Sequence, residues 1–447
     1  MLIRSRRDFF RTALRSVAGL SSIGALSKFG EMNALAAGPG YQALVCIFLA
    51  GGNDGHNTVI PIQTAQQNFS AYQNARSFLT LPQATLPQIH NGSDVYGLHP
   101  RLTEIQALYN SNKAAVVANL GMLVKPLTRA VYLGNNSSIL PNALFSHSDQ
   151  TSQWQSSIPT GLGSTGWGGR LADAVQAMNT GALFPSVTSV SGSSLFCTGA
   201  QTLPATVPPG GSAQLSGTGN AARMQGLQQL LTFDNGLQLV QAANSIFSRG
   251  VAYANTLNGL LATSTLTTPF PANNPLAQQL QTVARIIKVQ AQLGLSRQIF
   301  FCQLGGFDTH GGQLAIQDAL LQQLSQAAGA FYQSTVELGM DQNVVTFTAS
   351  EFGRTLTPNS DGTDHAWGNH HFVIGGAVKG GQFYGQYPSL ALGGPNDANT
   401  RGTLIPTTSV DQYGATLAQW FGVSPGNLSG IFPNVGNFAT PVLGVLG

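Results

Sequence analysis

Short apolar runs that alternate with helical patterns are the feature of this sequence that most restricts its fold. The runs have the length and composition of buried strands. They occupy residues 43–49, 114–120, 298–304, 343–349 and 371–377. Patterns with helical spacing occupy residues 102–109, 166–178, 223–262, 275–294, 313–338 and 408–423, the last with an N-cap at Thr408 or Ser409. This alternation predicts an α/β fold: a doubly wound, mainly parallel sheet with helices on both faces.

One stretch interrupts the pattern. Residues 180–222 are rich in Ser, Thr, Pro and Gly and hold only short β-like runs, so we expect an irregular insertion or cap there. The regular units before and after it predict a single large domain over residues 38–447.

Composition excludes several classes of protein. Only 8% of the residues are charged, the formal net charge is +3, and no basic stripe with interleaved aromatic residues exists, so we expect no nucleic-acid partner. The three cysteines Cys46, Cys197 and Cys302 lie far apart without metal-binding spacing. We expect Cys46 and Cys302 to be core residues, because they lie in apolar runs.

The N-terminal segment has the pattern of an export signal. Arg6 and Arg7 precede a moderately apolar stretch and a small-residue cleavage pattern at residues 34–36, which is typical of bacterial twin-arginine export. Residues 14–27 are too short and too rich in glycine to span a bilayer, and no later run reaches the ~20 apolar residues required. We therefore expect residues 1–37 to be an export signal, the twin-arginine machinery to be a partner, and the mature protein to be periplasmic or secreted.

Three of the apolar runs are followed by an acid: Asp54, Asp308 and Glu351. Ligands of open α/β sheets bind at the carboxyl ends of the strands, so the three acids can share a site. Asp308 and His310 point the same way in an extended chain and can hold one divalent ion. Alternatively, Asp54 is a turn residue before glycine, and His310 caps a neighbouring element. Glu351 is either a metal ligand or the ion-pair partner of Arg354.

Histidines are concentrated in the candidate motifs. A structural role as hydrogen-bonded polar residues does not explain a clustering of this strength. Six of the eight are His56, His147, His310, His365, His370 and His371.

Residues 144–154, LFSHSDQTSQW, supply candidate nucleophiles. Ser146 precedes a helix, and the N–H groups of a helix N-terminus favour phosphate or sulfate. A hydroxyl bound to a divalent ion is also activated for attack. The alternative is that Ser146, Ser148 or Asp149 simply caps the helix. His147 and Arg354 complete the catalytic candidates, with Arg354 as a cation for an anionic substrate.

Other common motifs are absent or out of context. GLGSTG at residues 161–166 matches the dinucleotide-binding glycine pattern but follows no apolar strand. The sequence contains no G-x-S-x-G elbow and no H-E-x-x-H.

Several stretches together resemble a known family, the exported bacterial domain of unknown function 1501. They are FLAGGNDGHNTVIP, LHPRLTEIQALY, the SH pair at 146–147, GGFDTHGGQ, SEFGRT, GTDHAWGNHHFVIGG and DQYGATLAQWFGV. That family is similar to the alkaline phosphatase and sulfatase superfamily, which implies an alkaline-phosphatase-like fold and an ester-hydrolysing site with one or two metal ions. In that resemblance Asp54 is the first acidic ligand, Ser146 the nucleophile, Asp308 and His310 a ligand pair, and His365 a late ligand.

The sequence also departs from those hydrolases. They carry Asp-His where this chain has Glu351 and Phe352, so one histidine ligand is missing unless His370 or His371 replaces it. The surroundings of Ser146 do not form the Cys-x-Pro-x-Arg signature of sulfatases.

Two functions remain open at this point. The first is an exported metal-dependent hydrolase of phosphate or sulfate esters that uses Zn, Mg, Mn or Ca. Its expected metal ligands are Asp54, Asp308, His310, Glu351, His365 and His371. The alternative is an exported, non-catalytic binding or cell-envelope assembly protein with a carbohydrate ligand.

Overall fold

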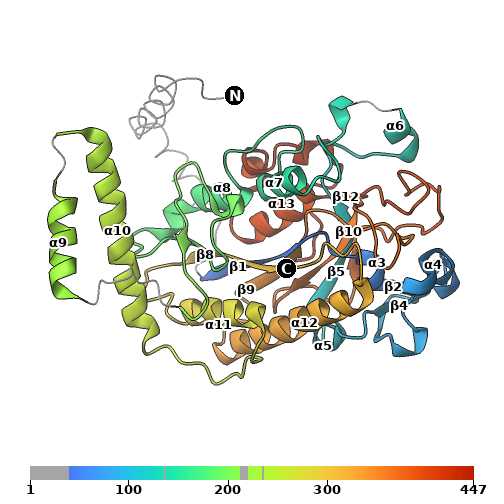
Figure 1. Ribbon diagram of the computed structural model, residues 1–447, viewed down its shortest axis with the longest axis horizontal. Coiled ribbons are helices and arrows are strands. Elements are labelled where there is room, and N and C mark those ends of the chain that lie inside the picture. Colours follow the sequence, from blue (N-terminus) through green and yellow to red (C-terminus); the bar gives the residue numbers. More distant parts are fainter. Residues whose placement is uncertain (1–39, 135–136, 212–219, 234–235) are drawn as a thin grey trace.

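The computed structural model describes residues 40–134, 137–211, 220–233 and 236–447. The expected export signal, residues 1–37, lies outside them. A central sheet has the strand order β11-β5-β10-β9-β1-β8-β6-β7, and β12 pairs with β5 (Figure 1). Its strands are β1 (Gln42–Ala50), β5 (Ala114–Gly121), β6 (Val187–Ser189), β7 (Ala205–Thr206), β8 (Arg297–Gly305), β9 (Val344–Ala349), β10 (Asn369–Ile374), β11 (Phe383–Tyr384) and β12 (Thr408–Ser409).

The pairing confirms a mainly parallel sheet. β1 lies in the middle and pairs in parallel with both β8 and β9. β10 is the exception, because it runs antiparallel to β9 and to β5. A second, antiparallel sheet of β2 (Val59–Gln63), β3 (Gln88–Asn91) and β4 (Asp94–Leu98) lies beside it.

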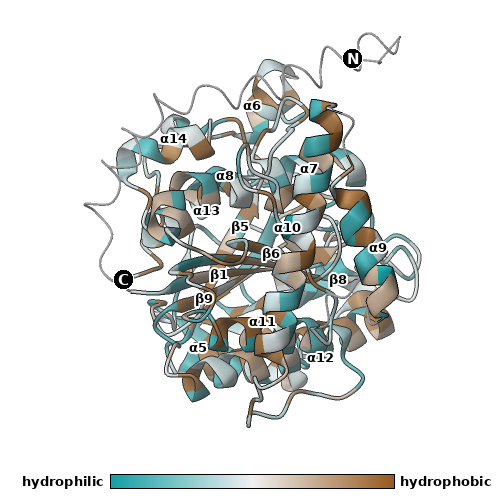
Figure 2. Cartoon of the chain, turned by 90° about the vertical axis from the view of Figure 1, so that its left-hand side faces the viewer, coloured by the Kyte–Doolittle hydropathy of each residue, from teal (hydrophilic) through white to brown (hydrophobic). Residues whose placement is uncertain are grey.

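Helices cover both faces of the central sheet, as the sequence predicts (Figures 1 and 2). One face carries α5 (Thr103–Asn110), α11 (Pro275–Lys288) and α12 (Gln313–Glu337); the other carries α7 (His147–Ser156), α8 (Trp167–Ala174) and α13 (Val410–Trp420). Alternate side chains of β1 point to opposite faces: Val45 and Ile47 pack with α11 and α12, whereas Leu44 and Phe48 pack with α8 and α13. β1 is therefore buried on both faces.

Short helices fill the connections between these layers. They are α3 (Gly55–Thr58), α4 (Phe69–Arg76), α6 (Arg129–Leu133) and α14 (Leu428–Ile431).

Local capping explains where two of the main helices begin. The Asn274 side chain accepts the backbone N–H of Ala277, and Pro275 occupies the first turn of α11. Ser409 and Gln412 form a capping box at the start of α13, which confirms one of the two predicted N-caps. The cysteines Cys46 and Cys302 are buried, as predicted.

The stretch expected to be an irregular insertion with short β-like runs holds two short strands. Within residues 180–211, β6 pairs with β8 and β7 pairs with β6, so this segment extends the central sheet by two short strands. The sequence signal was weak because strands of two and three residues carry no visible periodicity.

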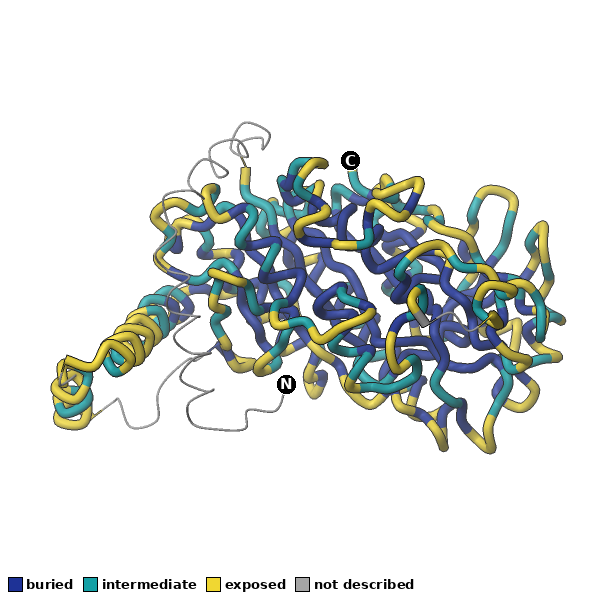
Figure 3. The backbone as a smooth tube through the Cα atoms, turned by 90° about the horizontal axis from the view of Figure 1, so that it is seen from above, coloured by how far each residue is buried: buried dark blue, intermediate teal, exposed yellow. Residues whose placement is uncertain are grey.

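Helices α9 (Ala221–Leu231) and α10 (Gln238–Leu261) follow that segment and project from the body, with mostly exposed residues (Figure 3). In the part of the chain that the structure describes, no helix is both long enough and apolar enough to cross a membrane.

A buried acid at the start of α13 generates a prediction about stability and pH. Asp411 accepts hydrogen bonds from the Asn434 N–H at 2.9 Å and the Ser157 hydroxyl at 3.1 Å. Burial raises the pKa of Asp411 from 3.8 to about 6, so the protonated form is favoured on folding. This contribution to stability is complete below about pH 4 and is lost as the pH rises through about 6.

Between pH 5 and pH 7.5 we expect wild type to lose about 1 to 2 kcal/mol more unfolding free energy than Asp411→Asn. The asparagine keeps an oxygen for Asn434 and has no charge to bury. Urea unfolding of both proteins at the two pH values measures this difference. Identical pH dependence in the two proteins would contradict the prediction.

Candidate metal centre

The register of three parallel strands brings three loops together at one edge of the sheet. Ala50 of β1 lies opposite Gly305 of β8, and Phe48 lies opposite Ala349 of β9. The loops after these strands therefore start side by side. Gly51 permits the close approach: its φ is +118°, and a Cβ there would lie 2.3 Å from the backbone nitrogen of Asp308.

Four side chains converge at this edge: one aspartate and three histidines. The Nε2 atoms of His147 and His310 lie 3.1 and 3.0 Å from Nε2 of His365. Oδ1 of Asp308 lies 3.0 Å from Nε2 of His310 and 3.1 Å from Nε2 of His365. Oδ2 of Asp308 lies 3.4 Å from Nε2 of His147. The Asp308 carboxylate and the Nε2 atoms of His147 and His365 thus face a common point, and His310 lies beside Asp308 and His365.

The opposite ring nitrogens of the histidines face oxygen atoms. Nδ1 of His147 lies 2.9 Å from Oε1 of Glu351, and Nδ1 of His365 lies 2.8 Å from the backbone oxygen of Phe145. Neither oxygen carries a hydrogen, so both Nδ1 atoms must donate. The Nε2 atoms of these two histidines therefore present lone pairs to the common point.

This arrangement fits a divalent metal ion. Two imidazole lone pairs that face each other at 3.1 Å repel unless a cation lies between them. Ligands at about 2.0–2.1 Å from a tetrahedral zinc ion are separated by roughly 3.3 Å, close to the distances found. A set dominated by imidazole suits zinc and other late transition metals better than magnesium or calcium.

Asp308 is held in its ionised form. Burial acts to raise its pKa, but the hydrogen bond and positive charge of Arg354 outweigh burial and lower the pKa to about 2. Nη1 of Arg354 donates to Oδ1 of Asp308 at 2.9 Å and to the backbone oxygen of Gly51 at 3.1 Å. The Arg354 side chain is fully buried, so it faces Asp308 and the protein interior rather than solvent.

Glu351 lies behind His147 rather than at the common point. Its Oε1 accepts the Gly51 N–H at 2.8 Å as well as the His147 Nδ1–H. A carboxylate in this position orients a ligating imidazole and increases its basicity. His310 has a looser counterpart, because its Nδ1 lies 3.6 Å from Oδ1 of Asp364.

Asp54, expected among the metal ligands, has other partners. Its carboxylate forms an ion pair with Arg76 and accepts the backbone N–H of His56 at 3.0 Å as the N-cap of α3. Nε2 of Gln313 donates to the same carboxylate. Both charged side chains are buried. A guanidinium therefore stands beside Asp54, where the resemblance led us to expect a metal ion.

His370 and His371 also have other partners. The His371 ring packs against Trp154, its Nδ1 lies 3.3 Å from Oγ1 of Thr348, and burial lowers its pKa to about 3. His370 stacks on Tyr387, and its Nδ1 accepts the Asn119 N–H at 3.2 Å. The third histidine of the cluster is instead His147, which we had expected to be catalytic. Spacing gave no signal for this, since His147 and His365 are 218 residues apart.

Ser146 lies directly before His147, as the N-cap residue of α7. Its hydroxyl donates to Oδ2 of Asp149 at 2.6 Å and lies 3.2 Å from Oγ of Ser148. The preceding residue, Phe145, has a φ of +73°, which is strained for a bulky side chain. This conformation accompanies the contact of its carbonyl with His365.

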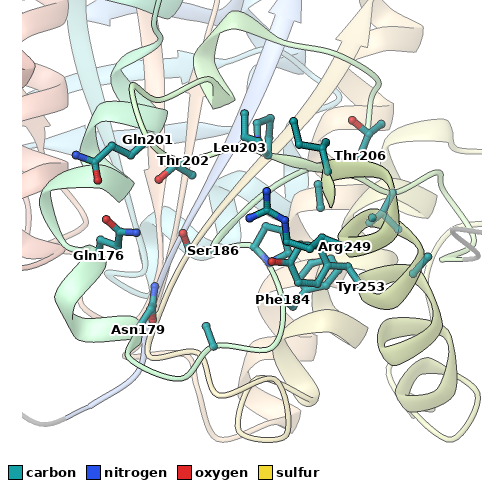
Figure 4. A pocket seen from close by; sticks show the side chains of 18 of the residues that line it. Gln176, Asn179, Phe184, Ser186, Gln201, Thr202, Leu203, Thr206, Arg249 and Tyr253 are labelled. Atoms are coloured by element: carbon teal, nitrogen blue, oxygen red, sulfur yellow. The ribbon is translucent and has the colours of Figure 1, made fainter. Parts of the chain in front are cut away.

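The centre opens to solvent, because the Asp308 and His310 side chains are each 45% exposed. A separate cavity of about 570 Å³ lies elsewhere, between the loops around residues 176–186 and 201–207 and helix α10. Figure 4 shows Gln176, Gln201, Arg249 and Tyr253 among its lining side chains. It belongs to the opposite end of β8, since Asn179 in its wall donates to the backbone oxygen of Arg297.

Comparison with known proteins gives a family and several distant structures. The model of a family described as "Protein of unknown function (DUF1501)" matches residues 41–401. No curated protein matches the sequence.

Three solved structures illustrate the distant likeness. The lipoteichoic acid synthase of Listeria monocytogenes is 9% identical with a TM-score of 0.32, covering 86% of this chain and 73% of that one. A sulfatase from Pseudoalteromonas sp. is 10% identical with a TM-score of 0.31, covering 90% and 75%. The phosphonate monoester hydrolase of Agrobacterium radiobacter is 10% identical with a TM-score of 0.31, covering 85% and 74%.

The hydrogen bonds of the cluster predict specific histidine tautomers. We expect His147 and His365 of the metal-free protein to carry the ring proton on Nδ1, because an oxygen acceptor faces each Nδ1. His56 should show the opposite tautomer, since its Nε2 lies 3.3 Å from the backbone oxygen of Gly402. Nitrogen chemical shifts of ¹⁵N-histidine-labelled protein measure this. A proton on Nε2 of His147 or His365 would contradict the inward lone pairs.

Proposed function

This chain belongs to the DUF1501 family, and from its site we propose that it is a metal-dependent hydrolase of phosphate or sulfate esters. One observation carries the proposal: the Nε2 lone pairs of His147 and His365 face the carboxylate of Asp308, and each outer ring nitrogen is fixed by an oxygen acceptor. His310 completes the set. These four residues are the proposed metal ligands.

A bound divalent ion would supply Lewis-acid polarisation of an ester oxygen. The protein's own groups would do the rest. The first-turn N–H groups of α7 have no acceptor within the helix and favour an anion. Ser146 is the proposed nucleophile: as its Oγ bonds to phosphorus or sulfur, its proton passes to Asp149 and the ester alkoxide leaves. Water attacking the same atom then releases phosphate or sulfate and restores the hydroxyl.

The roles of three further residues in this proposal follow from their contacts. Glu351 orients His147, and Arg354 fixes Asp308 rather than meeting substrate. Asp54 neither binds the metal nor contacts substrate in this proposal, because Arg76 neutralises it.

We propose export as well, on the twin-arginine pattern in residues 1–37. The substrate would then be an ester in the periplasm or outside the cell, such as a phosphorylated or sulfated carbohydrate of the cell envelope.

A non-catalytic binding or assembly protein is the second candidate, and one observation favours it. His310 lies 3.0 Å from Asp308 and from His365, and as a fourth ligand it would fill the last position of a tetrahedral zinc ion, which is typical of structural sites. Catalytic zinc sites keep a position open for water or substrate. Metal binding without ester hydrolysis would identify this case.

Metal content tests the centre directly. We expect the natively purified protein to carry roughly one divalent ion per chain, and His147→Ala and Asp308→Asn to lose most of it, because each removes a proposed ligand. Inductively coupled plasma mass spectrometry measures this. The exposed His90 provides the matched control, since His90→Ala removes a histidine outside the cluster and should keep the metal. A wild-type protein without metal would overturn the proposal.

Hydrolysis of a panel of aryl phosphate and aryl sulfate esters tests the reaction. We expect Ser146→Ala to lower kcat by about 100-fold or more with metal content unchanged, because the proposed nucleophile is lost. Ser148→Ala is the control and should retain activity. If the metal-loaded wild type consumes no ester of either class, the binding-protein candidate replaces the hydrolase.

A further inference from the structure

We propose that Gln313 is a positioning residue, which links the buried Asp54–Arg76 ion pair to the proposed ligand Asp308 and fixes the orientation of that carboxylate. The inference rests on the proposed metal centre and assigns a role to residues outside it. It also gives Asp54 a function other than metal binding.

A continuous chain of hydrogen bonds carries the proposal. Arg354 donates from Nη1 to Oδ1 of Asp308 at 2.9 Å and from Nε to Oγ1 of Thr363 at 2.9 Å. The Thr363 hydroxyl donates to Oε1 of Gln313 at 2.6 Å. Nε2 of Gln313 then donates to Oδ2 of Asp54.

The hydrogen bonds of this series run in one direction from donor to acceptor, and the Asp54 carboxylate determines that direction. An ionised carboxylate can only accept, so the Gln313 amide must turn its N–H₂ toward Asp54 and its oxygen toward Thr363. Thr363 has a single hydroxyl hydrogen, which goes to that oxygen. The hydroxyl lone pair is then free to accept from Arg354. If the amide flipped, a donor would face the Thr363 hydroxyl and an oxygen would face the Asp54 carboxylate.

The far end of the chain is anchored by its own contacts. Nε of Arg76 donates to Oδ1 of Asn57 at 2.9 Å, and its Nη1 donates to the backbone oxygens of Thr355 and Leu356 at 2.9 and 3.0 Å. The side chain of Arg76 is fully buried. The Asp54–Arg76 ion pair is therefore held in place by contacts that do not involve Gln313.

Asp308 needs such an anchor because it is partly exposed. Its side chain is 45% accessible, so packing alone does not restrict its rotation. Arg354, in contrast, is fully buried and holds Oδ1 from the protein side. Arg354 also donates to the backbone oxygens of Gly51 and Thr363, and the buried hydroxyl of Thr363, which is oriented by Gln313, holds its Nε.

A matched pair of glutamines on α12 isolates this role. Gln317 is one turn after Gln313, is also buried, and donates to the backbone oxygen of Asp54 at 3.0 Å rather than to its carboxylate. Gln313→Leu and Gln317→Leu both remove a buried amide from one helix. Only the first interrupts the chain to Asp308.

Affinity for Co²⁺, titrated by its visible absorption in the metal-free full-length protein, is the readout. We expect Gln313→Leu to weaken Co²⁺ binding about 10-fold, as loss of outer-shell partners does. Gln317→Leu should stay within about 2-fold of wild type. Equal losses in the two variants, or no loss in Gln313→Leu, would overturn the proposal.

A second pair covers the case in which Gln313→Leu fails to fold. Thr363→Val has the shape of threonine without its hydroxyl and should weaken Co²⁺ binding, whereas Thr363→Ser keeps the hydroxyl and should restore it. Equal affinities in these two variants would overturn the positioning role while leaving the metal centre intact. Failure of the wild type to bind Co²⁺ would instead reject the centre itself.

Discussion

The parallel register of β8, β1 and β9 is the constraint on which the rest of this structure depends. Residue-by-residue pairing from Gln42 with Arg297 to Ala50 with Gly305 makes the two strands end together. Because the strands are buried on both faces, a slip of register by one residue would turn their apolar side chains to the wrong layer. The register therefore fixes the fold and, in the same step, the positions of the loops that carry Asp308, Glu351 and Arg354.

In the candidate centre, partly exposed side chains face the common point and buried charged side chains hold them in place. Asp308 is half-exposed and faces the common point, whereas Arg354 and Glu351 are buried and hold Asp308 and His147 from behind. Removing either buried partner would leave the Asp308 carboxylate or the His147 imidazole without the group that orients it. The geometry of the exposed groups thus follows from hydrogen bonds made inside the protein.

Much of the fold was predictable from the sequence, because long periodic segments report burial directly. The strands β1, β5, β8 and β9 and the helices α11, α12 and α13 lie where the apolar patterns predicted them. The short β-like runs expected in residues 180–222 gave no positions for β6 and β7, since two or three residues cannot show a period. Of the candidate site residues, Asp308, His310 and His365 do come together, and their motifs were found from the acid or histidine among glycines.

The sequence by itself determined the layers of the fold and the edge of the sheet at which polar groups collect, because both follow from local patterns of burial and from the ends of strands. Only the tertiary structure decided which of those groups meet. Asp54 and His147 occupy equally suggestive motifs, yet a buried arginine takes Asp54, while His147 reaches Asp308 and His365 from the start of α7. The physical reason is that ion pairs and hydrogen bonds between distant segments depend on distances that no local pattern encodes.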